Sequence, residues 1–168
     1  MSKLKNGDNK INAHQLVVMM SLTQNALQKI IRREIKKLKL TPEQGAALIG
    51  IYVLGNNTTA AELSRFSFRE PASTTIILKR LEGLGLIKRT TDSKRKNVSR
   101  ISLTPTGYRL FQKAVKIRAM ENVVHKLSDE KLIELWTLLG DLKKHALINL
   151  HIDMNAHNEF FEKLSHLQ

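Results

Sequence analysis

Apolar residues recur at helical spacing along most of the chain, and this pattern predicts a mainly helical protein. From residue 11 to about 38 they return every three or four positions, which predicts a long amphipathic helix that needs a partner surface. Residues 42–54 are apolar nearly all round, so we expect this second helix to be buried. Thr41, Pro42 and Gln44 supply its start signals, a capping box with proline in the first turn.

Two shorter helices are predicted next, joined by a turn at residues 67–70. Thr59 can cap the first, which runs to about Phe66, and Glu62 stands three residues later as a capping box requires. Pro71 can open the second helix, and Gly83 and Gly85 can end it. The residues with helical spacing that we expect to face inward are Thr74, Ile77, Leu78 and Leu81.

The pattern then changes to that of a strand pair. Residues 86–90 and 98–103 are predicted strands, and Ile101 and Leu103 alternate with polar residues as one buried face requires. The intervening residues 92–97 are polar and cationic. Two short helices followed by such a hairpin have the order of a winged helix-turn-helix.

Helical periodicity resumes after the hairpin. Thr104 and Pro105 begin a predicted helix that continues to about His125, and Ser128 caps another that persists to His151 or beyond. Its apolar stripe is Leu132, Leu135, Trp136, Leu139 and Leu142, and the last residues carry Phe160, Phe161, Leu164 and Leu167. We expect the first and last helices to bury one another across two chains; covering their own chain's core is the alternative.

The net charge of +13, with an isoelectric point near 10.2, indicates a polyanionic partner, nucleic acid first and an acidic membrane surface second. Residues 71–100 hold eight basic and two acidic residues, a balance of +6 (8 − 2), whereas residues 101–168 carry +1 (9 − 8). A concentration of charge beside the helix-turn-helix is typical of a nucleic-acid footprint.

The outward face of the second short helix has the chemistry to read DNA. It carries Ser73, Thr75, Ile76, Lys79 and Arg80. Short hydroxyls bond base edges or phosphates, and an exposed isoleucine can meet a thymine methyl, although a solvated helix face is the alternative. With the wing cations Lys94, Arg95 and Lys96, these residues form the predicted DNA-binding set.

Four segments resemble, in order and spacing, the MarR family of bacterial winged helix-turn-helix regulators. They are residues 40–44, 60–64, 81–87 and 103–107. The resemblance implies a DNA-binding domain at 40–104 and a helical dimerisation region at 11–39 and 105–152. Outside the resemblance, composition and spacing predict a flexible basic tail at 1–10 and a helical extension at 153–168. It also implies a cytoplasmic homodimer that represses transcription from a pseudo-palindromic operator.

The resemblance further implies a small aromatic effector, bound in a cleft that Met19, Met20, Tyr52 and Trp136 could line. Such residues at helical spacing more often form core. In one respect the chain departs from the family. The wing usually carries an Asp-x-Arg pair, but the corresponding positions hold Arg95 and Asn97. Asp92 and Lys94 have the same spacing and could replace this pair at a position three residues earlier.

Several functions are disfavoured. The chain has no cysteine, so disulfides, thiolate zinc sites and cysteine redox sensing are excluded. Six histidines at undiagnostic spacing predict no metal site, and neither a phosphate-cradling glycine loop nor a nucleophile elbow suggests a cofactor or an enzyme. No long apolar run and no secretory signal are found, which predicts a cytoplasmic protein.

Two questions stay open at this point. The cations Lys29, Arg32, Arg33, Lys36 and Lys37 can form a solvated face, a supplementary DNA or inter-subunit surface, or a membrane-lying face. A winged-helix protein-interaction module or a basic RNA-binding structural protein is the alternative to a transcriptional regulator.

Overall fold

A computed structural model describes residues 12–55, 57–92 and 96–152. The predicted basic tail at 1–10, the wing residues Lys94 and Arg95, and the extension at 153–168 lie outside these ranges. In chain order, the elements are α1 (Ala13–Lys37), α2 (Pro42–Leu54), α3 (Ala60–Ser67), α4 (Pro71–Gly83), β1 (Ile87–Thr91), β2 (Ser99–Leu103), α5 (Pro105–Val115), α6 (Arg118–Val124) and α7 (Asp129–Asn149).

Local side-chain caps start the helices where the sequence predicts. The Thr41 hydroxyl accepts a hydrogen bond from the backbone N–H of Gln44 at 3.2 Å, and the Gln44 side-chain oxygen accepts one from the N–H of Thr41 at 2.8 Å. Thr59 and Glu62 form the same box at α3. Asn12 and Gln15 form a third at α1, which the sequence analysis missed. Each box satisfies two backbone donors that a helix N-terminus leaves free.

Helix α2 is the centre of the core, as its apolar sequence predicts. It contacts α1, α3, α4, α5 and β2. Leu48 and Ile51 on α2 have no exposed surface, and neither has Leu78 on α4. The Tyr52 ring stacks on Phe111 of α5 with ring centroids 4.1 Å apart, which fixes α5 across α2.

The two strands pair antiparallel, with Ile87 opposite Leu103 and Thr91 opposite Ser99. Thr58 adds an isolated bridge to Ile101, whose N–H donates to the Thr58 carbonyl at 2.7 Å. This bridge ties the segment before α3 to the wing. The predicted alternation on β2 is imperfect, because Ser102 is buried next to Ile101. Helices α2, α3 and α5 all contact β2, and so more than one face is covered.

The predicted single helix from Pro105 to about His125 is wrong. It is divided into α5 and α6 by a tight turn in which the Ile117 N–H donates to the Val115 carbonyl at 3.1 Å. No glycine or proline marks this break. The cause is tertiary, since Val115 and Ile117 pack against the core while α5 contacts α2 and α6 contacts α1.

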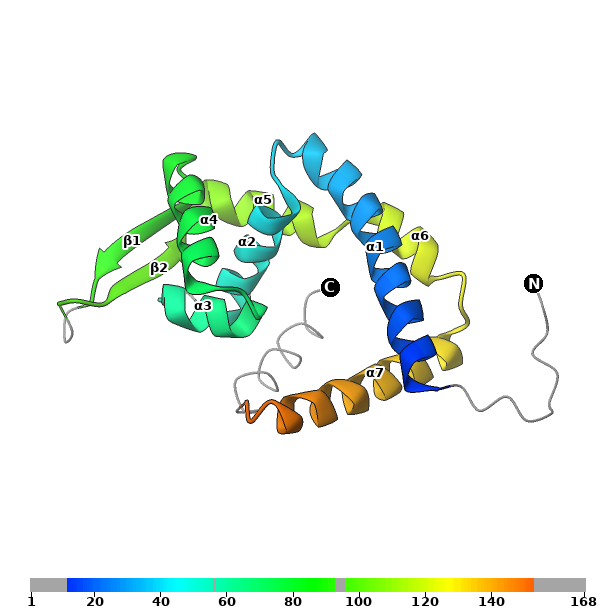
Figure 1. Cartoon of the computed structure of the whole chain (residues 1–168). Coiled ribbons are helices and arrows are strands. Elements are labelled where there is room, and N and C mark those ends of the chain that lie inside the picture. The colour runs from blue at the N-terminus through cyan, green and yellow to red at the C-terminus, as the bar shows by residue number, and fades with distance from the viewer. Residues whose placement is uncertain (1–11, 56, 93–95, 153–168) are drawn as a thin grey trace, which may run out of the picture.

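Helices α1 and α6 extend away from the winged helix, and α7 runs below them in the view, back toward the winged-helix side (Figure 1). Helix α7 begins after Ser128, although the Ser128 side chain makes no cap bond, and it ends at Asn149. Most large apolar side chains on α1 and α7 are exposed: Leu16, Val17, Val18, Met19, Met20 and Leu22, then Ile133, Leu135, Trp136, Leu138, Leu139, Leu142 and Ile148. In the part of the chain described, no helix combines the length and the apolar character needed to cross a membrane.

Candidate nucleic-acid interface

Helix α4 is fixed by its inner face and presents the predicted DNA-reading face outward. Thr74, Leu78 and Leu81 are buried, with exposed fractions of 2% or less. The side chains that point the other way are all exposed: Ser73, Thr75, Ile76, Lys79 and Arg80. Ile76 keeps 53% of its surface exposed although it is apolar, as a side chain that meets a base edge requires.

The Thr75 hydroxyl has a partner within its own helix. Its Oγ1 donates to the carbonyl of Pro71 at 2.9 Å. The hydroxyl proton is therefore used, whereas the oxygen lone pairs and the methyl group are left for an external partner. Thr75 is thereby suited to accept a hydrogen bond or to make an apolar contact.

The turn before α4 is held by its own hydrogen bonds. The Ser64 hydroxyl donates to the Arg69 carbonyl at 2.5 Å, and the Arg69 N–H donates to the Ser64 carbonyl at 3.1 Å. Phe68 takes a left-handed conformation here, with φ of 50°, and keeps 57% of its surface exposed. Glu70 makes no side-chain cap. These contacts set the direction in which α4 leaves α3.

Ion pairs decide which cations beside α4 remain available. Arg100 Nε lies 2.6 Å from Asp92 Oδ2. Arg89 Nε lies 3.0 Å from Glu82 Oε2, close enough for an ion pair although it lacks hydrogen-bond alignment. Both acids of residues 71–100 are thus paired with wing arginines. Among the described cations of this stretch, those that are exposed and have no ion pair are Lys79, Arg80, Lys88 and Lys96.

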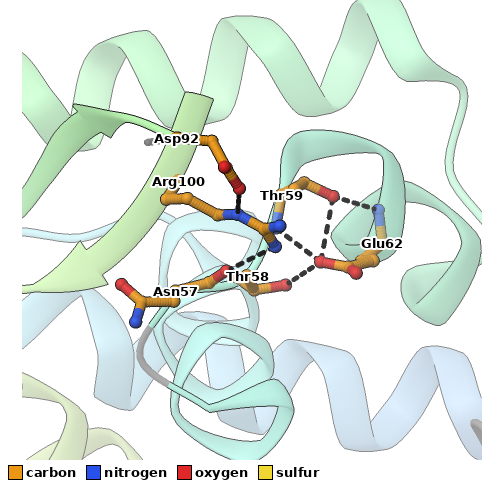
Figure 2. A network of polar contacts seen from close by, with 6 residues as sticks. All are labelled: Asn57, Thr58, Thr59, Glu62, Asp92 and Arg100. Atoms are coloured by element: carbon orange, nitrogen blue, oxygen red, sulfur yellow. Dashed lines mark hydrogen bonds and ion pairs between the residues drawn. The ribbon is translucent and has the colours of Figure 1, made fainter. Parts of the chain in front are cut away.

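A polar network joins the wing to the start of α3 (Figure 2). Besides its pair with Asp92, Arg100 donates from Nη1 to the Asn57 carbonyl at 3.1 Å. Glu62 Oε2 accepts from the Thr58 hydroxyl at 3.1 Å and from the N–H and hydroxyl of Thr59 at 2.7 and 2.9 Å. The base of the wing and the first helix of the helix-turn-helix therefore share one network.

The environment of Glu62 favours its ionised form. Burial alone would raise the pKa of this carboxyl, but the hydrogen bonds from Thr59 and Thr58 and the nearby charge of Arg100 outweigh burial. The pKa of Glu62 is consequently below its ordinary value of 4.5. The carboxylate is charged at neutral pH and holds the network as an acceptor.

The wing pair was the main feature that the sequence analysis missed. Asp92 was considered with Lys94, which lies outside the described residues, but its carboxylate pairs with Arg100 on the opposite strand. Because Thr91 is opposite Ser99, Asp92 and Arg100 are diagonal neighbours across the hairpin. The strand register would have revealed the pair, and it cannot be read from spacing alone.

The four residues proposed to line an effector cleft differ in their surroundings within one chain. Tyr52 stacks in the core, while Met19 and Trp136 are exposed on the long helices at 63% and 58%. Met20 is also exposed. Across residues 12–152, wherever the structure describes them, no three acidic or histidine side chains gather closely enough to hold a metal ion.

Comparison with known proteins supports the interpretation of this surface. Residues 40–98 match the model of the MarR family. The uncharacterised HTH-type transcriptional regulator YsmB of Bacillus subtilis (strain 168) is 28% identical over 103 residues, which cover 60% of this chain and 70% of that protein.

Solved structures extend the likeness over most of the chain. The organohalide-sensing transcriptional regulator RdhR-CbdbA1625, in its 2,4-dichlorophenol-bound form, is 29% identical with a TM-score of 0.71, covering 88% of this chain and 90% of that one. A mutant MarR from E. coli complexed with operator DNA is 18% identical with a TM-score of 0.69, covering 76% and 92%, and shows the fold alone.

These findings agree with the geometry described above. The matched residues include α2, α3, α4 and the first wing strand β1, and the neighbours are winged-helix transcriptional regulators. The family binds DNA and is not a family of enzymes. Residues 40–98, which hold the helix-turn-helix, match the MarR family of transcriptional regulators, and the rest of the chain resembles such regulators in fold.

Proposed function

We propose that the protein is a homodimeric repressor that binds a pseudo-palindromic operator through two copies of α4. The main support is the composition of the outer face of α4, where exposed hydroxyls and Ile76 are followed by the cations Lys79 and Arg80, which have no ion pair among the described residues. Hydroxyls and an apolar group read base edges, and the cations neutralise phosphates. A dimer would place its two helices on half-sites about 34–36 Å apart, one turn of DNA.

Dimerisation is supported by the long helices. Leu135, Trp136, Leu139 and Leu142 of α7 form the stripe expected from the sequence, and each has 40% or more of its surface exposed in one chain. Exposed apolar patches of this extent mark interaction surfaces. The exposed residues of α1 supply a second such surface, and burying both across two chains removes them from water.

We also propose that a small aromatic compound controls DNA binding. The support is the similarity to an organohalide-sensing regulator solved with 2,4-dichlorophenol. Met19, Met20, Tyr52 and Trp136 remain the proposed lining. The exposed Met19 and Trp136 would acquire a common cavity only in the dimer, so effector binding would depend on dimerisation.

The test is DNA binding by the full chain. Selection from random duplexes should recover two inverted half-sites, and a gel shift should show a preference for DNA upstream of its own gene over a scrambled duplex. Protection of both half-sites by one dimer is the expected footprint. Equal affinity for all duplexes, or preferential binding of RNA, would overturn the proposal in favour of the alternative functions.

A further inference from the structure

We propose that Asp92 and Arg100 form a positioning pair that fixes the wing against the start of α3, and that Arg100 acts through this pair instead of contacting DNA. The proposal rests on the proposed function, in which the wing and α4 meet the same duplex. The proposal explains why the wing carries Asp92, although a negative charge next to DNA is electrostatically unfavourable.

The geometry of the pair allows it to hold the two strands of the hairpin together. The Asp92 side chain is only 12% exposed and that of Arg100 is 32% exposed. The Asp92 N–H donates to the Val98 carbonyl at 2.8 Å, which continues the strand pairing beyond Thr91. The Arg100 guanidinium then uses two different nitrogens for two contacts, Nε toward Asp92 and Nη1 toward the Asn57 carbonyl. A lysine has one nitrogen and cannot reproduce this fork.

The second contact of Arg100 reaches a strained point of the backbone. Asn57 has φ of 109°, a conformation that non-glycine residues rarely adopt and that persists only where the surroundings hold it. Its N–H donates to the Ile101 carbonyl at 3.1 Å, and its carbonyl accepts from Arg100. Asn57 is thus held from β2 on both sides.

From Asn57 the contacts continue into the helix-turn-helix. Thr58, which is 3% exposed, bridges Ile101 and donates to the Glu62 carboxylate. Thr59 donates to the same carboxylate and caps α3 by accepting from the Glu62 N–H. An unbroken path therefore runs from Asp92 through Arg100 and Asn57 to α3 (Figure 2). Core packing of Ile87 and Ile101 holds the base of the hairpin. A two-stranded hairpin has little stability of its own beyond that base, and this path adds a polar link from the outer end of the wing to α3.

The first test uses Asp92→Asn, for which the two explanations predict opposite changes in DNA affinity. Asp92→Asn removes a negative charge from a DNA-binding surface, and electrostatics alone predicts tighter binding. A positioning role predicts the reverse, a roughly tenfold weaker affinity for the operator, of the order that coupled residues show. Glu82→Gln is the matched control, because it breaks the other acid–arginine pair of the same segment. It should leave operator affinity unchanged or tighten it.

Arg100→Lys separates the two roles of the arginine. If Arg100 positions the wing, this variant should weaken operator binding as Asp92→Asn does, without changing the slope of log affinity against log salt. If Arg100 instead contacts a phosphate, Arg100→Lys should be nearly silent, and Arg100→Gln should flatten the slope by about 0.9. The second result would overturn the proposal.

A readout without DNA distinguishes failure of this inference from failure of the proposed function. Because the chain has no cysteine, Lys96→Cys gives a single site for a nitroxide spin label on the wing. The label should become more mobile in both Asp92→Asn and Arg100→Lys, while circular dichroism confirms that the helices remain folded. Unchanged mobility in both variants would overturn the pair. Absence of any operator preference in the natural protein would overturn the proposed function, and the label would still test the pair.

Discussion

The Glu62 side chain caps α3 and belongs to the wing network through the same oxygen, so its charge supports two contacts at once. Its folded-state pKa is depressed, and it therefore contributes stability that is present above the ordinary pKa of 4.5 and is lost as pH falls through the folded value. Glu62→Gln keeps an oxygen that can accept the capping hydrogen bond, as Gln44 does at α2, but removes the charge. It should cost about 1 kcal/mol at neutral pH, because a charge-assisted hydrogen bond becomes a neutral one.

The difference between natural protein and Glu62→Gln should shrink as the pH falls below 4.5, because protonation removes the same charge from the natural protein. Urea unfolding over a pH series measures this. The exposed Glu121→Gln variant is the surface control. A difference that stays constant into the acid range would show that the Glu62 charge is not what holds the cap.

A second prediction at the residue scale divides base reading from phosphate contact. Thr75→Ala and Ile76→Ala should weaken operator binding by roughly 1–3 kcal/mol per lost contact while changing affinity for scrambled DNA much less. Lys88→Ala and Lys96→Ala should weaken both duplexes alike and flatten the salt slope by up to about 0.9 each. Salt titrations on both duplexes check this, and the opposite distribution of effects would contradict it.

At the scale of elements, the approach of α5 to the strand segment depends on Gly107. A Cβ at this position would lie 1.9 Å from the Leu86 carbonyl oxygen, which also accepts the Thr104 N–H at 3.0 Å and so cannot move freely. Gly107→Ala should therefore destabilise the fold by about 1–3 kcal/mol or more.

Gly83 is the matched control, because it is also helical and a Cβ there meets nothing within 4 Å. Gly83→Ala should be neutral or stabilise by up to about 1 kcal/mol. Thermal unfolding of the two variants gives the comparison. Similar melting temperatures for both would mean that α5 can shift away from the Leu86 carbonyl.

Elements that depend on neighbouring residues were predictable from the sequence, and elements that depend on distant contacts were not. The caps at Thr41 and Thr59 and the inner and outer faces of α4 follow from local chemistry and period, and the structure confirms them. The division of α5 from α6 has no glycine or proline to signal it, because packing on two different partners causes it. The Asp92–Arg100 pair required the strand register.

At the scale of the whole molecule, the dimer is the prediction on which the operator geometry depends. Leu139→Glu places a charge on the exposed stripe of α7 and should shift the protein from dimer to a 19.1 kDa monomer in sedimentation at micromolar concentration. Leu84→Glu is the control, because Leu84 is the same residue type and is even more exposed, but it follows α4. If neither variant dissociates, the α7 stripe is not the interface.

The turn at Lys116 also has a consequence that we expect for motion of the winged helix. The winged helix is joined to the long helices at two places, the Lys116 turn and the segment around Lys39, which has φ of 57°. A body attached at two points turns most easily about the line between them, so we expect the winged helix to rotate about this line, against the packing of Ile35 on the core.

Rotation of the winged helix about this line would change the distance between the two α4 helices of a dimer, while each helix stays intact. We expect an alanine inserted between Lys116 and Ile117 to change the preferred spacer between half-sites and to leave each half-site sequence unchanged. Selection from duplexes with randomised spacer length measures both properties. Altered half-sites at an unchanged spacing would mean that rotation about these two connections does not set the spacing of the half-sites.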